Sequence, residues 1–285
     1  MSTEAANSAT KLPHRRQFLY LAAGLGGAAL GGAALGGAAI WPAVRALQLQ
    51  VLRLQAEVVA AKIDQFIGEI ESQIRWTTLL PWSAATIDQW RFVGSRLLRQ
   101  VPAITKLSWL DAAGKEQASV STLPIAEPYV PDYSQDRKFT EAVARGLYYG
   151  PVYIQRESEP YMTLALRMRR EAGVSVAEVS LKWLWDVIAA IKFGGQAFMI
   201  NAQGRLIAHP DISLVLRNTD MTKLTQVIAA RAAAAGSPQE PVQTATDVGG
   251  RAVLTAYAPV AKLGWLVFVE LPIEEVFART MKNSG

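Results

Sequence analysis

Cysteine is absent from this chain of 285 residues, and histidine occurs only at His14 and His209. Without cysteine the protein can form no disulfide bond, no thiolate nucleophile and no cysteine-based metal site. This absence leaves both an extracytoplasmic and a cytoplasmic location open. The sequence therefore gives no reason to expect a bound metal or other cofactor.

A concentrated positive charge is also lacking. The net charge is +5, but the arginines are scattered and no basic run interleaves with aromatic residues, as a nucleic-acid groove would require. We therefore expect no nucleic-acid partner. Hydrophobic residues make up 51% of the chain, which is enough to bury a large core in one or two domains.

Charge is missing altogether from residues 17–42, a stretch long enough to cross a bilayer core of about 30 Å as a helix. Lys11, Arg15 and Arg16 precede it, and the positive-inside tendency predicts a cytoplasmic segment at residues 1–16. The span would then anchor the chain in the cell inner membrane, with all later residues in the periplasm. Membrane lipid is thus an expected partner.

The same stretch also has features of a cleavable export signal. The motif RRQFL, from Arg15 to Leu19, is typical of a twin-arginine signal, and Gly37 and Ala39 are small enough for a cleavage site. A retained anchor and a removed signal both remain open. Either one exports the rest of the protein.

A long amphipathic stalk helix is predicted for residues 43–80, where Gly68 is the only glycine and no proline occurs after Val44. Apolar residues recur there at three- and four-residue steps, at Leu52, Ala56, Val59, Ile63, Phe66, Ile70 and Ile74. A second apolar stripe contains Leu47, Val51, Leu54 and Val58. One stripe is expected to pack on the helix's own domain and the other on a second copy, giving a homodimer. The alternative is a helix buried only in its own domain.

The rest of the chain contains one pattern twice. WLDAAGKEQAS (109–119) and MINAQGRLIAH (199–209) both read as a strand, a turn that begins at Asp111 or Asn201, a glycine (Gly114 or Gly204), and a second strand. Further strands and a closing helix follow in each copy. The sequence predicts an α+β fold with two tandem modules, at residues 81–193 and 194–279, each with an antiparallel sheet of about five strands covered by helices on one face.

His209, Pro210 and Asp211 look at first like a reaction centre. A catalytic histidine needs a paired base or nucleophile, and the sequence offers none nearby. Asp211 is instead placed to cap the following ISLVLR segment. His14 lies across the predicted membrane span from His209, so the two cannot share a metal. We expect no enzyme activity.

DRKFTEAVARGLYYGPVYIQ in the first module and the segment from Ala177 to Asp220, which joins the two modules, resemble the double Cache sensor domains of bacterial transmembrane receptors. The resemblance implies PAS-like modules and a small ligand in the membrane-distal one. It also implies that residues 280–285 lead to a second membrane span and a cytoplasmic output domain, neither of which this chain contains.

The resemblance also suggests binding residues. Arg137 would pair with a ligand carboxylate, Phe139 would wall the pocket, Tyr153 would donate a hydroxyl, and Glu178 would meet an ammonium group. The ligand would be a small organic anion or zwitterion, such as an amino acid. An alternative for Arg137 is an ion pair with Asp136 or Glu141 on a solvated helix face. The repeat counterpart of Glu178 is Glu270, so the acid can also have an architectural role.

The predicted function is therefore extracytoplasmic sensing of a small molecule by the input domain of a transmembrane receptor. The alternative is a ligand-binding protein without its own output, either anchored in the membrane or exported by the twin-arginine route.

Overall fold

The computed structural model describes residues 36–79, 86–122, 131–155, 159–168, 173–191, 195–235 and 243–282. Its contacts separate residues 1–47 from a compact unit, residues 48–285, which contains both sheets. The predicted cytoplasmic segment (1–16), most of the predicted span or export signal (17–42) and the predicted module boundary at 193/194 fall outside the described ranges. No helix within those ranges combines the length and hydropathy that a membrane span requires.

The predicted stalk is helix α1, Gly36–Thr77, which begins before residue 43 and ends before residue 80. Its buried positions repeat at helical spacing because one face packs against the sheets of residues 48–285. This face agrees with the first predicted stripe except at Phe66, which is partly exposed and whose ring lies 3.9 Å from that of Trp183. The buried positions are Leu52, Ala56, Val59, Ala60, Ile63, Ile67, Ile70 and Ile74.

The first module is an antiparallel sheet in the order β2-β1-β6-β5-β3, with β4 also paired to β5. The sheet has six strands instead of about five because β3 and β4 cover one edge of β5 in succession. Its strands are β1 (Ile104–Asp111), β2 (Glu116–Ser121), β3 (Leu147–Tyr149), β4 (Tyr153–Gln155), β5 (Glu159–Arg167) and β6 (Gly173–Ser180).

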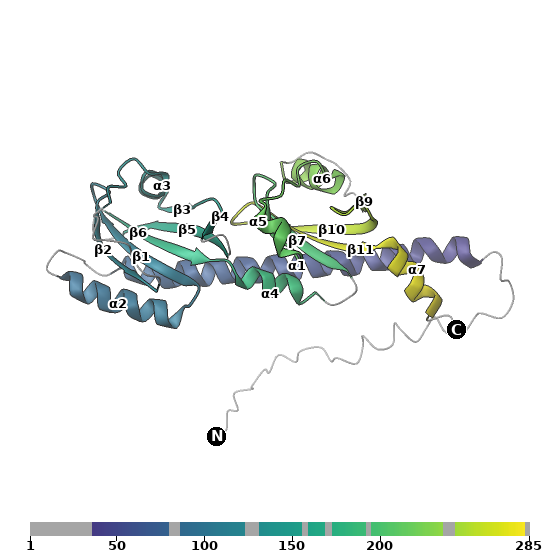
Figure 1. Ribbon diagram of the computed structural model, residues 1–285, viewed down its shortest axis with the longest axis horizontal. Coiled ribbons are helices and arrows are strands. Elements are labelled where there is room, and N and C mark those ends of the chain that lie inside the picture. Colours follow the sequence, from purple (N-terminus) through teal and green to yellow (C-terminus); the bar gives the residue numbers. More distant parts are fainter. Residues whose placement is uncertain are drawn as a thin grey trace, which may run out of the picture. The chain divides into compact units, whose positions relative to one another are not determined.

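Helices lie on both faces of this sheet, whereas the sequence predicted helices on only one face. Helix α3 (Arg137–Arg145) lies on one side, and α1 with α2 (Ile87–Gln100) on the other (Figure 1). The stalk helix makes the difference, because it packs along the face opposite the crossover. On that face the hydroxyls of Thr77 and Ser175 are 3.1 Å apart.

The second module is a five-stranded antiparallel sheet in the order β8-β7-β11-β10-β9, as predicted. Its strands are β7 (Gln196–Ile200), β8 (Leu206–Ala208), β9 (Thr244–Thr246), β10 (Ala252–Val260) and β11 (Trp265–Pro272). Its helices are α5 (Ile212–Leu216), α6 (Thr225–Ala234) and α7 (Ile273–Lys282), and α4 (Trp183–Ala189) joins the modules.

The repeated turn has the predicted geometry in both modules. Asp111 Oδ1 accepts hydrogen bonds from two backbone amides, and Asn201 Oδ1 does the same one module later. Gly114 and Gly204 both have a positive φ, of 81° and 82°. A side chain at Gly114 would also meet the Ser134 backbone at 2.6 Å. These turns confirm the tandem repeat.

His209 has the structural role predicted for it. Its ring is buried, and Nδ1 accepts a hydrogen bond from the Asp211 amide at 2.8 Å. Burial lowers the pKa of the imidazole and so favours its neutral form. Asp211 in turn caps α5 by accepting from the Ser213 amide at 2.9 Å.

Candidate functional site

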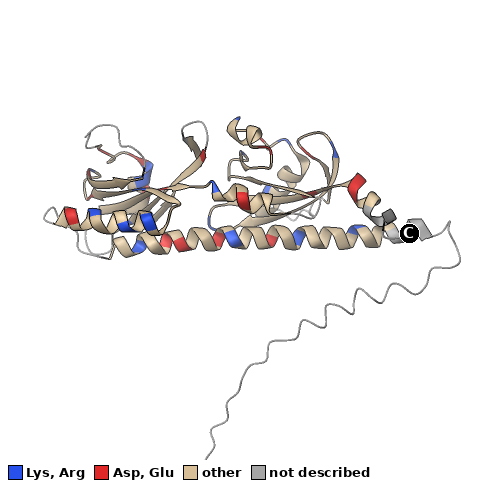
Figure 2. Cartoon of the chain, turned by 60° about the horizontal axis from the view of Figure 1, so that its bottom comes forward, with Lys and Arg blue, Asp and Glu red and all other residues tan. Residues whose placement is uncertain are grey.

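A polar row crosses the first sheet at Lys106, Glu178 and Thr163. Strand register places Lys106 of β1 opposite Glu178 of β6, and Glu178 opposite Thr163 of β5. Directly opposed residues project from the same face of a sheet, so these three side chains are neighbours. Charged residues are otherwise sparse on the strands of both sheets (Figure 2). A lysine and a glutamate at the centre of a sheet therefore single out this position.

The crossover between β2 and β3 covers this row and encloses a small cavity of about 20 Å³. Two lysines, two glutamates and a tyrosine contribute to its wall, which consists of Lys106, Ser108, Leu110, Glu116, Tyr133, Lys138, Val176 and Glu178. The positive and negative groups are both present because they come from different elements, the β1–β2 hairpin, β6 and the start of α3.

These charges are only loosely paired with one another. Lys106 Nζ is 3.9 Å from Glu116 Oε2, which is buried and accepts no hydrogen bond from any described group. Lys138 Nζ sits over the Tyr133 ring, 3.5 Å from its centre, in a cation–π contact. The wall thus has both a carboxylate oxygen and an ammonium group with bonding capacity left for a ligand.

The structure does not bring Arg137 to this cavity. Its side chain is 77% exposed and lies 3.7 Å from Glu141, the alternative pairing considered above. Asp136 caps α3, so Arg137 is the first residue of the helix and points away from the sheet. Lys138, one residue later, reaches the cavity instead. Consecutive helix residues are rotated by about 100°, so the neighbouring position supplies the cation.

The other three predicted residues lie on the cavity side of the module. Phe139 is buried in a core cluster with Leu110 and Val176, beneath the cavity. The half-buried Tyr153 lies near Glu178: burial, and then the charge of Glu178, raise the pKa of the Tyr153 hydroxyl to about 12. A hydrogen bond from Thr163 partly offsets this rise. The structure thus places Tyr153 near Glu178, and Phe139 in the adjacent core cluster.

Sequence reasoning missed Lys106, Glu116 and Lys138. The sequence does contain a signal for Lys106. Lys106, Ser108 and Leu110 occur at alternate positions of β1, so their side chains project from the same face of the sheet. Glu116 follows from its pairing with Leu110 across the β1–β2 hairpin. No local signal distinguishes Lys138 from Arg137, since the start of α3 sets which one faces inward.

The second sheet has a polar row at the same position, with glutamine in place of the lysine. Gln196, Glu270 and Thr255 oppose one another on β7, β11 and β10, at the repeat positions of Lys106, Glu178 and Thr163. The next row is Phe198, Phe268 and Tyr257, where the first sheet has Ser108, Val176 and Ala165.

Aromatic packing fills that next row of the second sheet. The rings of Phe198 and Phe268 are stacked at 4.8 Å between centres, and Tyr257 lies 5.8 Å from Phe268. In the first sheet the equivalent places hold Ser108, Val176 and Ala165. These smaller side chains leave more space above the sheet at this row.

Comparison with known proteins agrees with this architecture. The Cache domain family matches residues 37–280. The chain belongs to the double Cache family. The solved extracellular domain of the histidine kinase soHK1S-Z6 superposes with a TM-score of 0.61 and 18% identity, over 84% of this chain and 99% of that one. The ligand-binding domain of PctB, a Pseudomonas aeruginosa amino acid chemoreceptor in complex with L-Arg, gives 0.60 and 18%, over 82% and 91%.

A curated relative points to the same class of receptor. The methyl-accepting chemotaxis protein PscA of Pseudomonas syringae pv. tomato is 37% identical over 62 residues, which cover 20% of this chain and 10% of that receptor. The double Cache domain is homologous to the ligand-binding sensor domains of chemoreceptors and histidine kinases. This chain accordingly contains a sensor domain of the double Cache family.

Proposed function

We propose that the first module binds a small zwitterion of the amino acid type in the pocket over its polar row. The observation that carries this proposal is the presence of both charges in one wall. Lys138 and Lys106 would receive a carboxylate, while Glu178 and Glu116 would receive an ammonium group. Tyr153 would add its hydroxyl beside Glu178. Phe139 shapes the apolar floor.

The ligand would replace contacts that the free domain makes within itself. The enclosed volume of about 20 Å³ is too small for an amino acid, so the crossover with Tyr133 and Lys138 must move outward on binding. Opening would break the cation–π contact of Lys138 with Tyr133 and separate Lys106 from Glu116, whereas the ion pair of Lys138 with Asp136 at 3.5 Å lies within the moving segment and could be kept. PctB, whose domain was solved with L-Arg, supports the ligand class.

Helix α1 would carry the signal away from the pocket. Glu71 accepts a hydrogen bond from the Tyr149 hydroxyl at 2.9 Å and lies 3.9 Å from Lys262 Nζ, so it joins α1 to both modules. Asp64 also accepts hydrogen bonds from the backbone amides of Ala261 and Lys262. A shift of the first module would thus displace the helix along which the second module is fixed.

The remaining assignments follow from this role. The residues before α1 would anchor the domain in the inner membrane, with the two modules in the periplasm and the output domain on another part of the receptor. α1 would also pair with a second copy, because Leu54 and Val58 are 55% and 56% exposed on the same helix face. Ile63 is fully buried within the domain, so substitutions there would test folding instead of dimerisation.

A thermal-shift screen of the full chain in detergent, with the standard amino acids and γ-aminobutyrate, tests the proposed ligand class. We expect at least one to raise Tm, with a Kd in the micromolar range, or about 8 kcal/mol of binding. Glu178→Gln and Lys138→Met should each abolish that shift. Arg137→Ala, and Arg205→Ala in the second module, should leave it unchanged as matched controls. If Arg137→Ala alone removes the shift, the cation comes from Arg137 and the pocket must reorganise to reach it.

A further inference from the structure

Strand β10 is paired along only part of one of its edges. On one side β11 pairs with residues 253–260. On the other side β9 pairs only with Ala252–Leu254, and the Thr255 amide donates a hydrogen bond to the Gln243 carbonyl. No described strand continues this edge along residues 256–260. The second half of β10 is therefore an open sheet edge.

The backbone groups of Tyr257 point out of this open edge. Backbone hydrogen bonds of alternate residues go to opposite sides of a strand, so Tyr257 points to the same side as Thr255, away from β11. Within the described ranges, neither the amide nor the carbonyl of Tyr257 has a hydrogen-bond partner. Pro259, two residues further, has no amide hydrogen, and proline is typical of such an outward position on an edge strand. The edge thus offers a free donor and a free acceptor at Tyr257.

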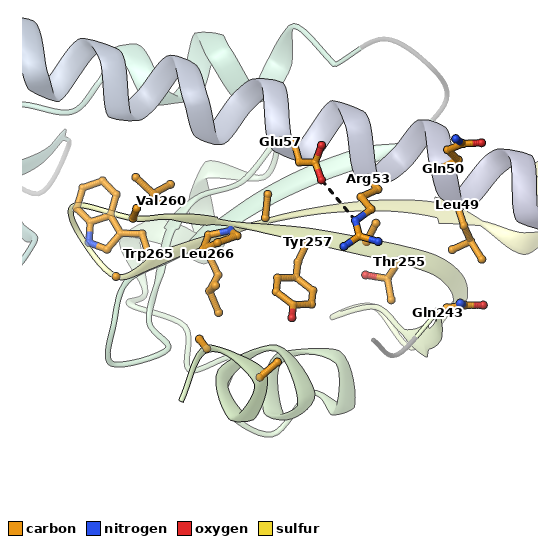
Figure 3. Close-up of a pocket in the computed structure, with 17 residues that line it drawn as sticks. Leu49, Gln50, Arg53, Glu57, Gln243, Thr255, Tyr257, Val260, Trp265 and Leu266 are labelled. Carbon is orange, nitrogen blue, oxygen red and sulfur yellow. Dashed lines mark ion pairs between the residues drawn. The ribbon is translucent and has the colours of Figure 1, made fainter. Parts of the chain in front are cut away.

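A groove with a volume of about 680 Å³ runs along this edge, within the range of small-molecule sites. It follows β10 from Thr255 to Val260, a length of about 17 Å at roughly 3.4 Å per residue. Helix α6 lies on one side of it and α1 on the other (Figure 3).

The two walls of the groove differ in polarity. Tyr257 and Leu266 project toward α6, and with Ala233 they make this wall apolar (Figure 3). On the side of α1 the wall contains Arg53 and Glu57, with Arg53 Nε 3.4 Å from Glu57 Oε1. The free backbone groups of β10 therefore lie in a groove with one apolar and one polar wall.

We propose that the second module binds a short extended peptide as an added strand on the open edge of β10. The peptide residue opposite Tyr257 would accept a hydrogen bond from the Tyr257 amide and donate one to its carbonyl, as in an antiparallel pair. The length of the groove fits about five residues. Peptide side chains that face α6 would be apolar, and those that face α1 would be polar. This site goes beyond the proposed zwitterion site, since it lies in the other module and takes a different class of ligand.

A free peptide fits this groove better than the sheet edge of a second copy. A folded sheet carries covering layers of its own, and α1 and α6 would block those layers beside β10 (Figure 3). A single added strand needs only the spacing of about 4.8 Å between neighbouring strands. The bound peptide would also contact Arg53 and Glu57, which are both more than half exposed, so their ion pair can rearrange. Occupancy of the groove would thus act on the helix that both modules share.

The test uses the pentapeptide STVTS, acetylated and amidated at its ends, with the full chain in detergent. Its central valine would lie opposite Tyr257 and face α6. Calorimetry should show saturable binding of one peptide per chain. The same peptide with a methyl group on the valine amide nitrogen keeps every side chain but cannot donate to the Tyr257 carbonyl. It should bind about tenfold more weakly.

The end of α6 provides a matched pair of variants. Ala234 lines the groove, whereas Ala235 is not among its lining residues, and both are exposed. Ala234→Phe should place a ring in the groove and weaken peptide binding by about tenfold. Ala235→Phe should leave the affinity unchanged, and so should Glu178→Gln in the first module.

Three results would each overturn the proposal. They are no binding of the pentapeptide at about 1 mM, equal affinity for the N-methylated peptide, and equal affinity of Ala234→Phe. Loss of binding in Glu178→Gln would instead assign the peptide to the first module. If the pentapeptide does not bind and Ala234→Phe converts a dimer to monomer in analytical ultracentrifugation, the edge belongs to a second copy. The amino acid thermal shift does not depend on these results, so the zwitterion site is tested separately.

Discussion

The two modules place a glutamate at the same point of the same sheet and surround it differently. Glu178 in the first sheet is flanked by Lys106 and remains partly accessible, whereas Glu270 in the second is flanked by Gln196 and is fully buried. The exchange of one lysine for a glutamine changes what a central carboxylate does. For the buried Glu270, burial raises the pKa to about 7, so its protonated form is favoured relative to an exposed glutamate.

The row of residues next to each acid also differs between the two sheets, in the size of its side chains. In the second sheet this row holds the stacked rings of Phe198 and Phe268 and the tilted ring of Tyr257, while smaller residues occupy the equivalent row of the first. The second module therefore gains stability from aromatic packing in this row, whereas the equivalent row of the first module holds the smaller side chains of Ser108, Val176 and Ala165.

The largest expected effect comes from breaking the aromatic row. Phe268→Ala removes a fully buried ring and should lower the free energy of unfolding by about 3–5 kcal/mol. Val176→Ala at the matched position of the first sheet should cost roughly 1.5 kcal/mol, because it removes only two methyl-sized groups. Urea denaturation of both variants measures the difference. Equal losses would show that the two rows contribute alike.

The second-largest expected effect is on the pH dependence of stability, to which Glu270 should contribute. The pKa of Glu270 is about 7 in the folded protein and near 4.5 when unfolded, so the unfolded state releases its proton first as pH rises. Stability should therefore fall between pH 5 and pH 8, by roughly 2–3 kcal/mol from this group.

Urea titrations of the parent protein and of Glu270→Gln at the two pH values measure that contribution. Between pH 5 and pH 8 the free energy of unfolding should decrease by roughly 2–3 kcal/mol less in Glu270→Gln than in the parent protein. In Glu178→Gln it should decrease as much as in the parent. A parent protein and a Glu270→Gln variant with the same pH profile would contradict the burial argument.

Exchanging the flanking residue sharpens the comparison at a smaller scale. Gln196→Lys gives Glu270 the neighbour that Glu178 has, and should lower the pKa of Glu270 by at least one unit, about 1.4 kcal/mol. The variant should therefore be more stable than the parent at pH 8 and show a flatter profile. Carbon-13 NMR titration of labelled glutamates reads the pKa of Glu270 in the parent and the variant, and an unshifted value would exclude the flanking residue as the cause.

The smallest expected effect on stability concerns α1, which the two modules share. Leu54→Glu and Val58→Glu alter exposed side chains and should change the free energy of unfolding by no more than about 0.5 kcal/mol. They should nevertheless shift a dimer to monomer in analytical ultracentrifugation. Glu69→Gln, an exposed change elsewhere on α1, serves as the control. A parent protein that is already monomeric at high concentration would rule out this interface.

Much of the fold was predictable because its signals are local. The helical spacing along α1 and the paired turns at Gly114 and Gly204 depend on nearby residues alone. The sixth strand of the first sheet and the second helical layer could not be predicted, because they depend on how segments distant in the sequence pack together. At the candidate site, the resemblance suggested Glu178, Tyr153 and Arg137; the structure places the first two near each other, but it leaves Arg137 exposed and lines the cavity with Lys138. The rotation of a short helix about its axis decides between those two, and neighbouring residues do not fix it.

The hydrogen bonding of Glu270 and Thr255 in the second module was also beyond sequence reasoning. Glu270 could be recognised as the counterpart of Glu178, but the unpartnered state of its Oε2 and of Thr255 Oγ1 depends on what Gln226 and the β9–β10 turn reach in three dimensions. A pattern shows where polar residues occur and leaves their hydrogen bonds undetermined.

Isothermal titration calorimetry of the amino acid that gives the largest thermal shift, against the parent protein, Glu178→Gln and Glu270→Gln, tests the central claim most directly. We predict one site per chain with micromolar affinity, lost in Glu178→Gln and retained in Glu270→Gln. Retention of binding in Glu178→Gln together with loss in Glu270→Gln would place the amino acid site in the second module and contradict the account.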